Sequence, residues 1–160
     1  MKKYHYISSP VGLLELGVEN NTLHSVLFVD EKRFAETADP LLDETEKQLN
    51  AYFAGTRLEF DLPLGQAGTP FQEKVWNELL HIPFGKTISY LELSKRIGDV
   101  KAIRAVGTTN GKNNIAIICP CHRVIGSDGS LTGYAGGLHR KQWLLKHERE
   151  LVFGKQEMLF

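Results

Sequence analysis

Two cysteines stand two positions apart in the stretch IAIICPCHRVIG, residues 115–126. Cys119 and Cys121 are the only cysteines of the chain; a proline separates them and His122 follows directly. A thiolate is a strong nucleophile, and a neighbouring histidine is a common base for forming it. The spacing therefore predicts a nucleophilic or a metal-binding thiol.

Pro120 restricts the backbone on both sides of the thiols. The residue before a proline is extended, so Cys119 continues the apolar run 115–118, which is typical of a buried strand. The φ angle of proline suits the first position of a helical turn. Cys121 then lies near the N–H groups that begin this turn, which favours the thiolate.

Three interpretations of these residues stay open. Glu148, in the predicted last helix, is placed to orient His122 as the base for Cys121. Cys119, next to an apolar strand, is typical of a small core residue. A zinc site at Cys119, Cys121 and His122 needs a fourth ligand from His5, His24, His81, His139 or His147.

Charge is unevenly distributed along the 160 residues, although the net charge is zero. Residues 1–85 contain seven Lys and Arg against thirteen Asp and Glu, and residues 86–160 contain twelve against six. Such a distribution is typical of a protein whose second half binds a polyanion. Chance and solvated helix faces can give the same pattern. The chain shows no apolar leader and no apolar run approaching about 18 residues. We therefore expect a cytoplasmic protein with no membrane partner.

The first part of the chain predicts a small antiparallel sheet followed by a helix. Short apolar, partly alternating runs separated by turn residues occur at 3–7, 12–18 and 22–29. Residues 41–54 place apolar side chains at helical spacing up to Gly55. The segment 62–68 contains one proline, two glycines and no charge, so it is the best linker.

The second part predicts a helix-turn-helix. Thr69 and Pro70 begin a helix, and Ser89 caps a second one that Gly98 closes. A third short helix covers about 100–109. The apolar stripe of the first helix is Phe71, Val75, Trp76, Leu79 and Leu80.

The segments after the cysteines predict a wing and a last helix. Ser-Asp-Gly at 127–129 separates Val124-Ile125 from Leu131, which indicates a hairpin. In a helix near 138–149, we expect Trp143, Leu144 and Leu145 to face inward and Arg140, Lys141 and Lys146 to face outward.

The helix near 100–109 has an unusual composition. Small residues, Ala102, Ala105 and Gly107, surround a single Arg104. Small side chains let a helix approach another surface closely, and the arginine then projects into that surface. An alanine-rich helix packed on its neighbour, with Arg104 merely solvated, is the alternative.

The motif PCHRVIG at 120–126 resembles the O6-alkylguanine-DNA alkyltransferases (methylated-DNA–protein-cysteine methyltransferases), in particular bacterial members. The flanking segments NNIAIIC and LTGYAGGLHRKQWLLKHE are similar as well. Upstream, TPFQEKVW, IPFGKTISY and KAIRAVGTTN extend the similarity, which covers about residues 69–150. The resemblance implies a winged helix-turn-helix that binds the minor groove of double-stranded DNA and flips a damaged guanine into a pocket beside a reactive thiol.

The resemblance also implies roles for individual residues. Cys121 is the alkyl acceptor, and His122 acts through a water with Glu148 to deprotonate it. Tyr90 rotates the target phosphate and protonates the departing guanine, and Arg104 fills the vacated base stack. The DNA contacts are Arg104, Tyr90, Ala102, Ala105 and Gly107. The thioether product makes the chain a single-turnover, suicide enzyme without a cofactor, acting on O6-alkylguanine and also on O4-methylthymine.

Two further positions match the family pattern, and two others depart from it. Asn113 ties the recognition helix to the active-site loop, and Tyr134 is a pocket-wall residue. Ala135 stands where some members have a serine, so only its N–H remains for the substrate oxygen. Ala116 stands where some members have a proline, which suggests a roomier pocket. Some members bind zinc through N-terminal cysteines; none precedes Cys119 here, so we expect no metal.

The sequence therefore predicts an α/β (α+β) protein. An N-terminal α/β lobe is expected at 1–65, a DNA-binding and methyltransferase domain at 66–153, and a tail at 154–160, in a monomer. Two rival classes are a lesion-binding winged-helix protein without chemistry and a cysteine hydrolase. Cys121 at the acceptor position argues against the first, and the adjacent His122 with a basic helix-turn-helix argues against the second.

The C-terminal residues GKQEMLF form a separate candidate motif. Gln156, Met158, Leu159 and Phe160 resemble the pentapeptide by which bacterial polymerases and repair proteins dock on the replication sliding clamp. Tail-in-pocket recognition raises the effective concentration of a repair protein near replication. The alternative is that these apolar residues pack on the N-terminal lobe or fray.

Overall fold

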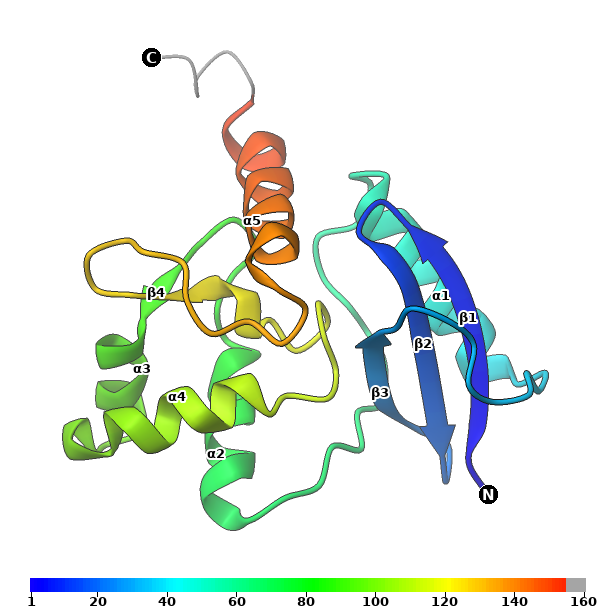
Figure 1. Cartoon of the computed structure of the whole chain (residues 1–160), viewed down its shortest axis with the longest axis horizontal. Helices are drawn as coiled ribbons and strands as arrows, with labels where there is room; N and C mark the ends of the chain where they lie inside the picture. The colour runs from blue at the N-terminus through cyan, green and yellow to red at the C-terminus, as the bar shows by residue number, and fades with distance from the viewer. Residues whose placement is uncertain (155–160) are drawn as a thin grey trace. The chain divides into compact units, whose positions relative to one another are not determined.

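The computed structural model describes residues 1–154, which form two compact units. Unit 1 contains residues 1–67 together with 114–116, and unit 2 contains residues 68–113 and the chain from 117 onward. Figure 1 shows a sheet with a helix in unit 1 and mainly helices in unit 2. This mixed architecture confirms the predicted fold class. Among the described residues, no helix is both long and apolar enough to cross a bilayer.

The sheet of unit 1 is antiparallel, in the order β1 (Lys3–Ser9), β2 (Gly12–Glu19) and β3 (Thr22–Phe28). The β2–β3 turn is tight because Asn20 and Asn21 both have positive φ angles, which asparagine adopts more readily than most residues. Helix α1 (Pro40–Phe53) packs against the strands. The buried core includes Leu14, Leu16, Leu42, Leu49 and Tyr52. The predicted sheet and helix are thus present, with small shifts at their ends.

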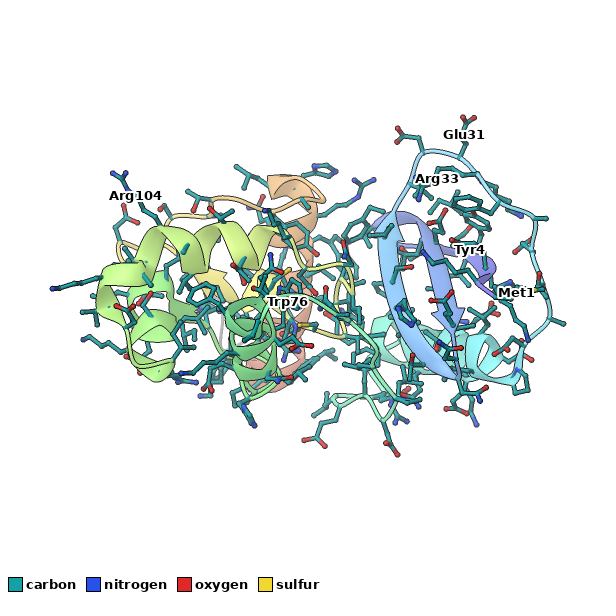
Figure 2. The ribbon with its side chains drawn as sticks, turned by 90° about the horizontal axis from the view of Figure 1, so that it is seen from below. Met1, Tyr4, Glu31, Arg33, Trp76 and Arg104 are labelled. Atoms are coloured by element: carbon teal, nitrogen blue, oxygen red, sulfur yellow. The ribbon has the colours of Figure 1, made fainter. Side chains whose placement is uncertain are left out.

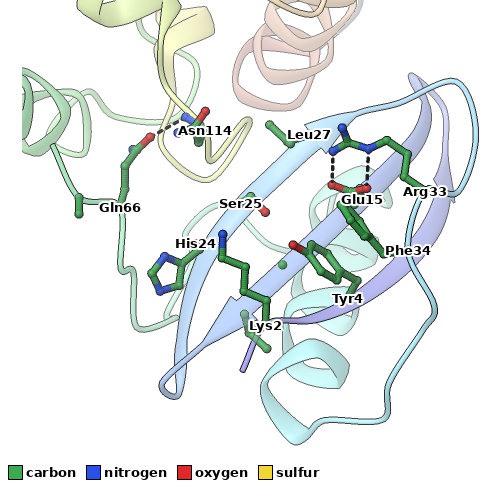
Figure 3. Close-up of a pocket in the computed structure, with 13 residues that line it drawn as sticks. Lys2, Tyr4, Glu15, His24, Ser25, Leu27, Arg33, Phe34, Gln66 and Asn114 are labelled. Atoms are coloured by element: carbon green, nitrogen blue, oxygen red, sulfur yellow. Dashed lines mark hydrogen bonds and ion pairs between the residues drawn. The ribbon is translucent and has the colours of Figure 1, made fainter.

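The other face of this sheet carries a groove of about 360 Å³ that lies wholly within unit 1 (Figure 3). The rings of Tyr4 and Phe34 stack there, with centroids 4.2 Å apart. The carboxylate of Glu15 is buried and accepts hydrogen bonds from Arg33 Nη2 at 2.7 Å and from the Tyr6 hydroxyl at 2.8 Å. Because a buried carboxylate requires such partners, these contacts hold the loop after β3 against the sheet.

The short segment that returns to unit 1 extends its sheet at β3. The Val26 N–H donates to the Asn114 carbonyl at 2.8 Å, and the Ala116 N–H donates to the Val26 carbonyl at 3.0 Å. The pairing is one isolated bridge, so the buried strand predicted over 115–118 is wrong. It stops because Ile117 has a φ of 72°, a left-handed conformation that is rare for a β-branched residue.

Unit 2 begins with helix α2 (Pro70–Leu79), whose start is the predicted one. The Gln72 N–H donates to Thr69 Oγ1, and the Thr69 N–H donates to Gln72 Oε1, which is a capping box. Val75, Trp76 and Leu79 are buried. Leu80, predicted for the same stripe, lies past the helix end and is exposed.

The helix-turn-helix consists of α3 (Tyr90–Arg96) and α4 (Ile103–Gly111), and the 3-10 turn η1 (Val100–Ala102) precedes α4. Ser89 caps α3, because its hydroxyl accepts from the Glu92 N–H. Gly98 has a φ of 88°, which favours glycine after the end of α3. The last helix, α5 (Leu138–Phe153), is longer than predicted.

The predicted hairpin of the wing is wrong. The strand β5 (Val124–Ile125) pairs in parallel with β4 (Ile88–Ser89), which precedes α3. The turn itself forms, because the Gly126 N–H donates to the Ser130 carbonyl at 2.9 Å. Within the described residues, no strand follows this turn to pair with β5. The Thr132 carbonyl instead accepts hydrogen bonds from the side chains of Tyr90 and Lys141.

Candidate active site

Residues 119–123, here called the acceptor turn, form a tight bend in unit 2. Pro120 has φ −83° and ψ 62°, and the Cys121 N–H donates to the Cys119 carbonyl at 2.8 Å, which defines an inverse γ-turn. A 3-10 turn, η2 (Cys121–Arg123), follows. Cys119 is buried, and its thiol contacts the Trp76 carbonyl at 3.7 Å. This environment suits a core residue.

The Cys121 thiol is also buried, and its pKa is raised above the ordinary value. Burial is the main cause. A hydrogen bond from Asn113 Nδ2 to Sγ at 3.2 Å and the charge of Lys141 lower the pKa without outweighing it. The backbone N–H of Cys121 also lowers the pKa, as expected for this turn, but burial outweighs it and the resting thiol stays protonated. Cys121 needs a base before it can act as a nucleophile.

His122 has the tautomer that a base requires. Its Nε2 lies 2.7 Å from Glu148 Oε2, and because a carboxylate only accepts, Nε2 carries the hydrogen and Nδ1 the lone pair. Nδ1 is buried and has no hydrogen-bond partner within residues 1–154. Burial lowers the pKa of His122 in spite of Glu148, so the ring is neutral near pH 7. The ring is thus able to accept a proton.

Glu148, in α5, joins three parts of unit 2. Arg123 donates to both of its oxygens, at 2.8 and 3.1 Å, and the Gly85 N–H donates at 3.2 Å. Arg123 also donates to the Ile82 carbonyl at 2.7 Å. Burial raises the pKa of Glu148, but His122 and Arg123 outweigh it and hold the pKa far below its ordinary value. Glu148 is therefore ionised and fully paired.

Lys141 is buried in the same unit, so its predicted outward orientation is wrong. Its Nζ donates to the Val124 carbonyl at 2.6 Å and to the Thr132 carbonyl at 2.8 Å. The Tyr90 hydroxyl donates to the same Thr132 carbonyl at 3.1 Å, and Nζ lies 5.8 Å from the centre of the Tyr90 ring. Lys141 precedes the buried Leu144 by one helical turn, which explains its inward position.

Two of the residues expected to contact DNA lie on the outer face of α4. Arg104 and Ala105 are exposed, and Arg104 projects away from the helix (Figure 2). Ala102 and Gly107 are half-buried. Gly107 faces Tyr90, because a Cβ there would lie 3.8 Å from the Tyr90 ring.

The inner side of α4 holds the acceptor turn through two amides. Asn113, just past the helix, donates from Nδ2 to the Cys119 carbonyl at 2.8 Å as well as to Cys121 Sγ. Asn110, one turn earlier, donates from Nδ2 to the Cys121 carbonyl at 3.2 Å. The structure thus brings Asn113 to the thiol and joins the end of α4 to the acceptor turn.

A shallow depression of about 560 Å³ lies along residues 131–138 and Gly111. Tyr134 and Ala135, both expected in the substrate pocket, line it. Burial raises the pKa of Tyr134 well above its ordinary value. Ala116 belongs to unit 1, and its place in a pocket stays a prediction. Within residues 1–154, no three His, Cys, Asp or Glu side chains group as a metal site.

Sequence reasoning missed the contributions of Arg123, Lys141 and Asn110. Arg123 adjoins His122 in the sequence, but its partners Glu148 and Ile82 lie far away along the chain. For Lys141 and Asn110, helical spacing was an available signal. Lys141 falls on the stripe of Leu144, and Asn110 stands one turn before Asn113.

Comparison with known proteins gives one family over nearly the whole chain. The family model described as 6-O-methylguanine DNA methyltransferase, DNA binding domain, matches residues 70–150. The model described as 6-O-methylguanine DNA methyltransferase, ribonuclease-like domain, matches residues 2–66.

Individual relatives and solved structures agree. The methylated-DNA–protein-cysteine methyltransferase of Methanosarcina acetivorans is 47% identical over 151 residues, covering 91% of this chain and 97% of the relative. That of Mycobacterium tuberculosis is 47% identical over 154 residues, covering 93% of each. The crystal structure of the Mycobacterium tuberculosis O6-methylguanine methyltransferase has a TM-score of 0.86 at 44% identity, covering 100% of both chains. The crystal structure of Mycobacterium tuberculosis OGT in complex with DNA also has a TM-score of 0.86, at 48% identity. The match covers 93% of this chain and 94% of that chain.

The lowered pKa values of His122 and Glu148 predict how unit 2 responds to acid. Both values lie below those of the unfolded chain, so the unfolded state binds more protons and the free energy of unfolding falls on acidification. The loss begins below pH 6.5, where unfolded His122 titrates, and steepens below pH 4.5, where unfolded Glu148 titrates. Denaturant titrations between pH 7 and 3, followed by tryptophan fluorescence, measure it.

Glu148→Gln tests whether Glu148 causes the steeper loss of stability below pH 4.5. The variant should lack that component and be less stable at pH 7 by about 3–5 kcal/mol, because Arg123 stays buried without its carboxylate. Glu150→Gln, at a partly exposed position of the same helix, is the matched control. An unchanged acid profile in Glu148→Gln would show that this carboxylate does not govern it.

Proposed function

This chain belongs to the 6-O-methylguanine DNA methyltransferase family, and we propose that Cys121 is the residue that accepts the alkyl group. Its relatives are methylated-DNA–protein-cysteine methyltransferases, and the chain acts in DNA repair by alkyl transfer to cysteine. The observation that carries the assignment is the buried Cys121 thiol, held by Asn113 next to a neutral His122 that Glu148 orients. A lesion binder without chemistry would not need a thiol at this position.

The proposed reaction is an in-line displacement at the alkyl carbon. His122, acting through a water, removes the proton of the Cys121 thiol. The thiolate attacks the alkyl carbon of O6-alkylguanine, the carbon–oxygen bond breaks, and its electron pair stays on the base. Tyr90 protonates the departing base and later regains the proton taken from the thiol. The thioether has no leaving group, so each chain acts once, and the steps need no cofactor.

We propose that α4 and the turn before it approach the minor groove, where their small residues leave room. Ala102, Ala105 and Gly107 allow close approach, and Arg104 enters the space that the flipped nucleotide leaves. Tyr134 and Ala135 line the depression that would receive the base, with Ala116 assigned to the same pocket. The alkyl carbon of O4-methylthymine is bonded to oxygen in the same way, so this base is a second proposed substrate.

The proposed DNA-binding and methyltransferase domain covers 66–153, after an N-terminal lobe at 1–65. We place the protein in the cytoplasm, because both cysteines are free and a reducing compartment preserves a reactive thiol. We also propose a monomer, because unit 2 by itself contains all the proposed catalytic side chains.

We expect one methyl group per protein, on Cys121, after incubation with DNA containing O6-methylguanine. Cys121→Ala should abolish the gain in intact mass and retain DNA binding, because the proposed DNA contacts lie on α4. Cys119→Ala, two residues away, is the matched control and should still be methylated. Repeated turnover, or a methyl group mapped to Cys119, would contradict the proposal.

Arg104→Ala should slow repair in duplex DNA by roughly tenfold or more, because extrusion of the base loses its support. Reaction with free O6-benzylguanine, which needs no extrusion, should be unchanged. Single-turnover rates on the two substrates measure the difference, with exposed Arg149→Ala as a charge control. Equal losses on both substrates would refute this role for Arg104.

We also propose that Gln156, Met158, Leu159 and Phe160 dock on the replication sliding clamp. These residues lie outside the described part of the chain, so the proposal rests on the motif alone. Deleting 156–160 should remove binding to immobilised clamp and leave the single-turnover rate on short oligonucleotides unchanged. If the deletion leaves clamp binding unchanged, or if it unfolds the protein, the docking proposal is wrong and the tail has a structural role.

A further inference from the structure

The groove on the sheet of unit 1 is not used by the reaction described above (Figure 3). Its floor is Gly17, in the central strand β2. A Cβ at this position would overlap the Ser25 hydroxyl and lie 3.4 Å from the Tyr4 ring, so the floor stays open only because glycine stands there. The volume of about 360 Å³ falls in the range of roughly 300–1,000 Å³ that small-molecule sites occupy.

One wall of the groove is aromatic, and buried groups fix its position. The rings of Tyr4 and Phe34 stack at 4.2 Å with 15° between their planes. The N–H groups of Arg33 and Phe34 both donate to the Tyr6 hydroxyl at 3.0 Å, and this hydroxyl donates to the buried Glu15 carboxylate. Phe34 is nevertheless 44% exposed. The network therefore holds an aromatic ring at the surface, where a flat ligand packs well against it.

The groove is positively charged, although unit 1 is acidic. Residues 1–67 contain six Lys and Arg against eleven Asp and Glu. Among the described residues that line the groove, Lys2 and Arg33 are cations and Glu15 is the single carboxylate. Glu15 is paired with Arg33 at 2.7 Å, so the charge of Lys2 stays uncompensated within the groove. Positive charge concentrated in an acidic unit indicates an anionic ligand.

Arg33 is able to attract an anion while it stays on Glu15. Its Nε and Nη2 donate to the carboxylate at 3.1 and 2.7 Å. A guanidinium has further N–H groups on Nη1, and the Arg33 side chain is 51% exposed. Lys2 and His24 line the groove on the side away from Arg33 (Figure 3). The open floor and the aromatic wall thus lie between basic side chains.

We propose that this groove binds a free nucleoside monophosphate. The base lies over Gly17 and against the wall of Tyr4 and Phe34, Lys2 binds the phosphate, and Arg33 adds positive potential. A nucleotide combines the two features that the groove selects, a flat ring and an anion. A nucleic-acid strand fits less well, because its further phosphates would meet an acidic unit, including residues 30–31 in the loop before Arg33.

The test uses the full chain and deoxyadenosine 5′-monophosphate, which has no alkyl group for Cys121 to accept. In a titration followed by ¹H–¹⁵N NMR, the amide signals of Gly17 and Ser25 should shift and saturate. Deoxyadenosine lacks the phosphate and inorganic phosphate lacks the base. Each should therefore bind at least about tenfold more weakly than the monophosphate.

Filling the floor tests the place of the base. Gly17→Ala combined with Ser25→Ala adds a methyl group to the floor and removes the hydroxyl that it would overlap. This double variant should weaken the binding of both deoxyadenosine monophosphate and deoxyadenosine by about tenfold or more, because the added methyl group occupies the place of the base. Ser25→Ala alone is the matched control and should bind like the wild type.

Removing one charge tests the place of the phosphate. Lys2→Gln should weaken the binding of the monophosphate by about fivefold at low salt and leave that of deoxyadenosine unchanged. Lys47→Gln, at an exposed position of α1, makes the same change in net charge and should have no effect on either ligand. Lys2 is exposed and precedes β1, so this variant retains the fold.

Three results would overturn the proposal. No saturable shift at residues 17 and 25 with millimolar monophosphate, or a shift that the floor-filling variant leaves unchanged, would show that the groove is not the site. Equal binding of inorganic phosphate would show that no base is recognised. A tetranucleotide of deoxyadenosine should bind at most about fourfold more tightly than the monophosphate, in proportion to its nucleotides. Tighter binding at these residues would assign the groove to a strand instead.

Discussion

The buried carboxylate of Glu148 is the interaction on which the rest of unit 2 depends. It comes from α5 and binds Arg123 and His122 of the acceptor turn and the Gly85 N–H of the segment before β4. A buried charge is tolerated only when it is paired and hydrogen-bonded, so separating any of these segments would leave a buried charge without its partner. The same pairing gives His122 its tautomer. One carboxylate thus stabilises the fold and prepares the base.

Burial makes the Cys121 thiol less reactive, but it also protects the thiol of a protein that reacts only once. The raised pKa of Cys121 keeps it protonated at rest, and a protonated thiol is a poor target for oxidants and stray electrophiles. The groups that favour the thiolate, Asn113 and Lys141, are already in place. In the proposed function, deprotonation then depends on His122.

Helix α4 serves two surfaces at once. Its outer side combines small residues with Arg104, and the amides at its end, Asn110 and Asn113, hold the acceptor turn. A helix is rigid over this length, so in the proposed function the position of DNA on one side determines the position of the thiol relative to the base. The aromatic ring of Tyr90 packs beside Gly107 in the same arrangement.

The sequence by itself determined the elements whose signals are local. Thr69, Ser89 and Gly98 mark helix ends through contacts within a few residues, and Cys121 and His122 are neighbours in the chain. The family was also recognisable from contiguous motifs. Only the tertiary structure decided the parallel partner of β5, the burial of Lys141, the protonation of the thiol and the contacts of Asn110. Each of these depends on desolvation or on a hydrogen-bond partner from a distant segment, and neither is encoded in the residues next to it.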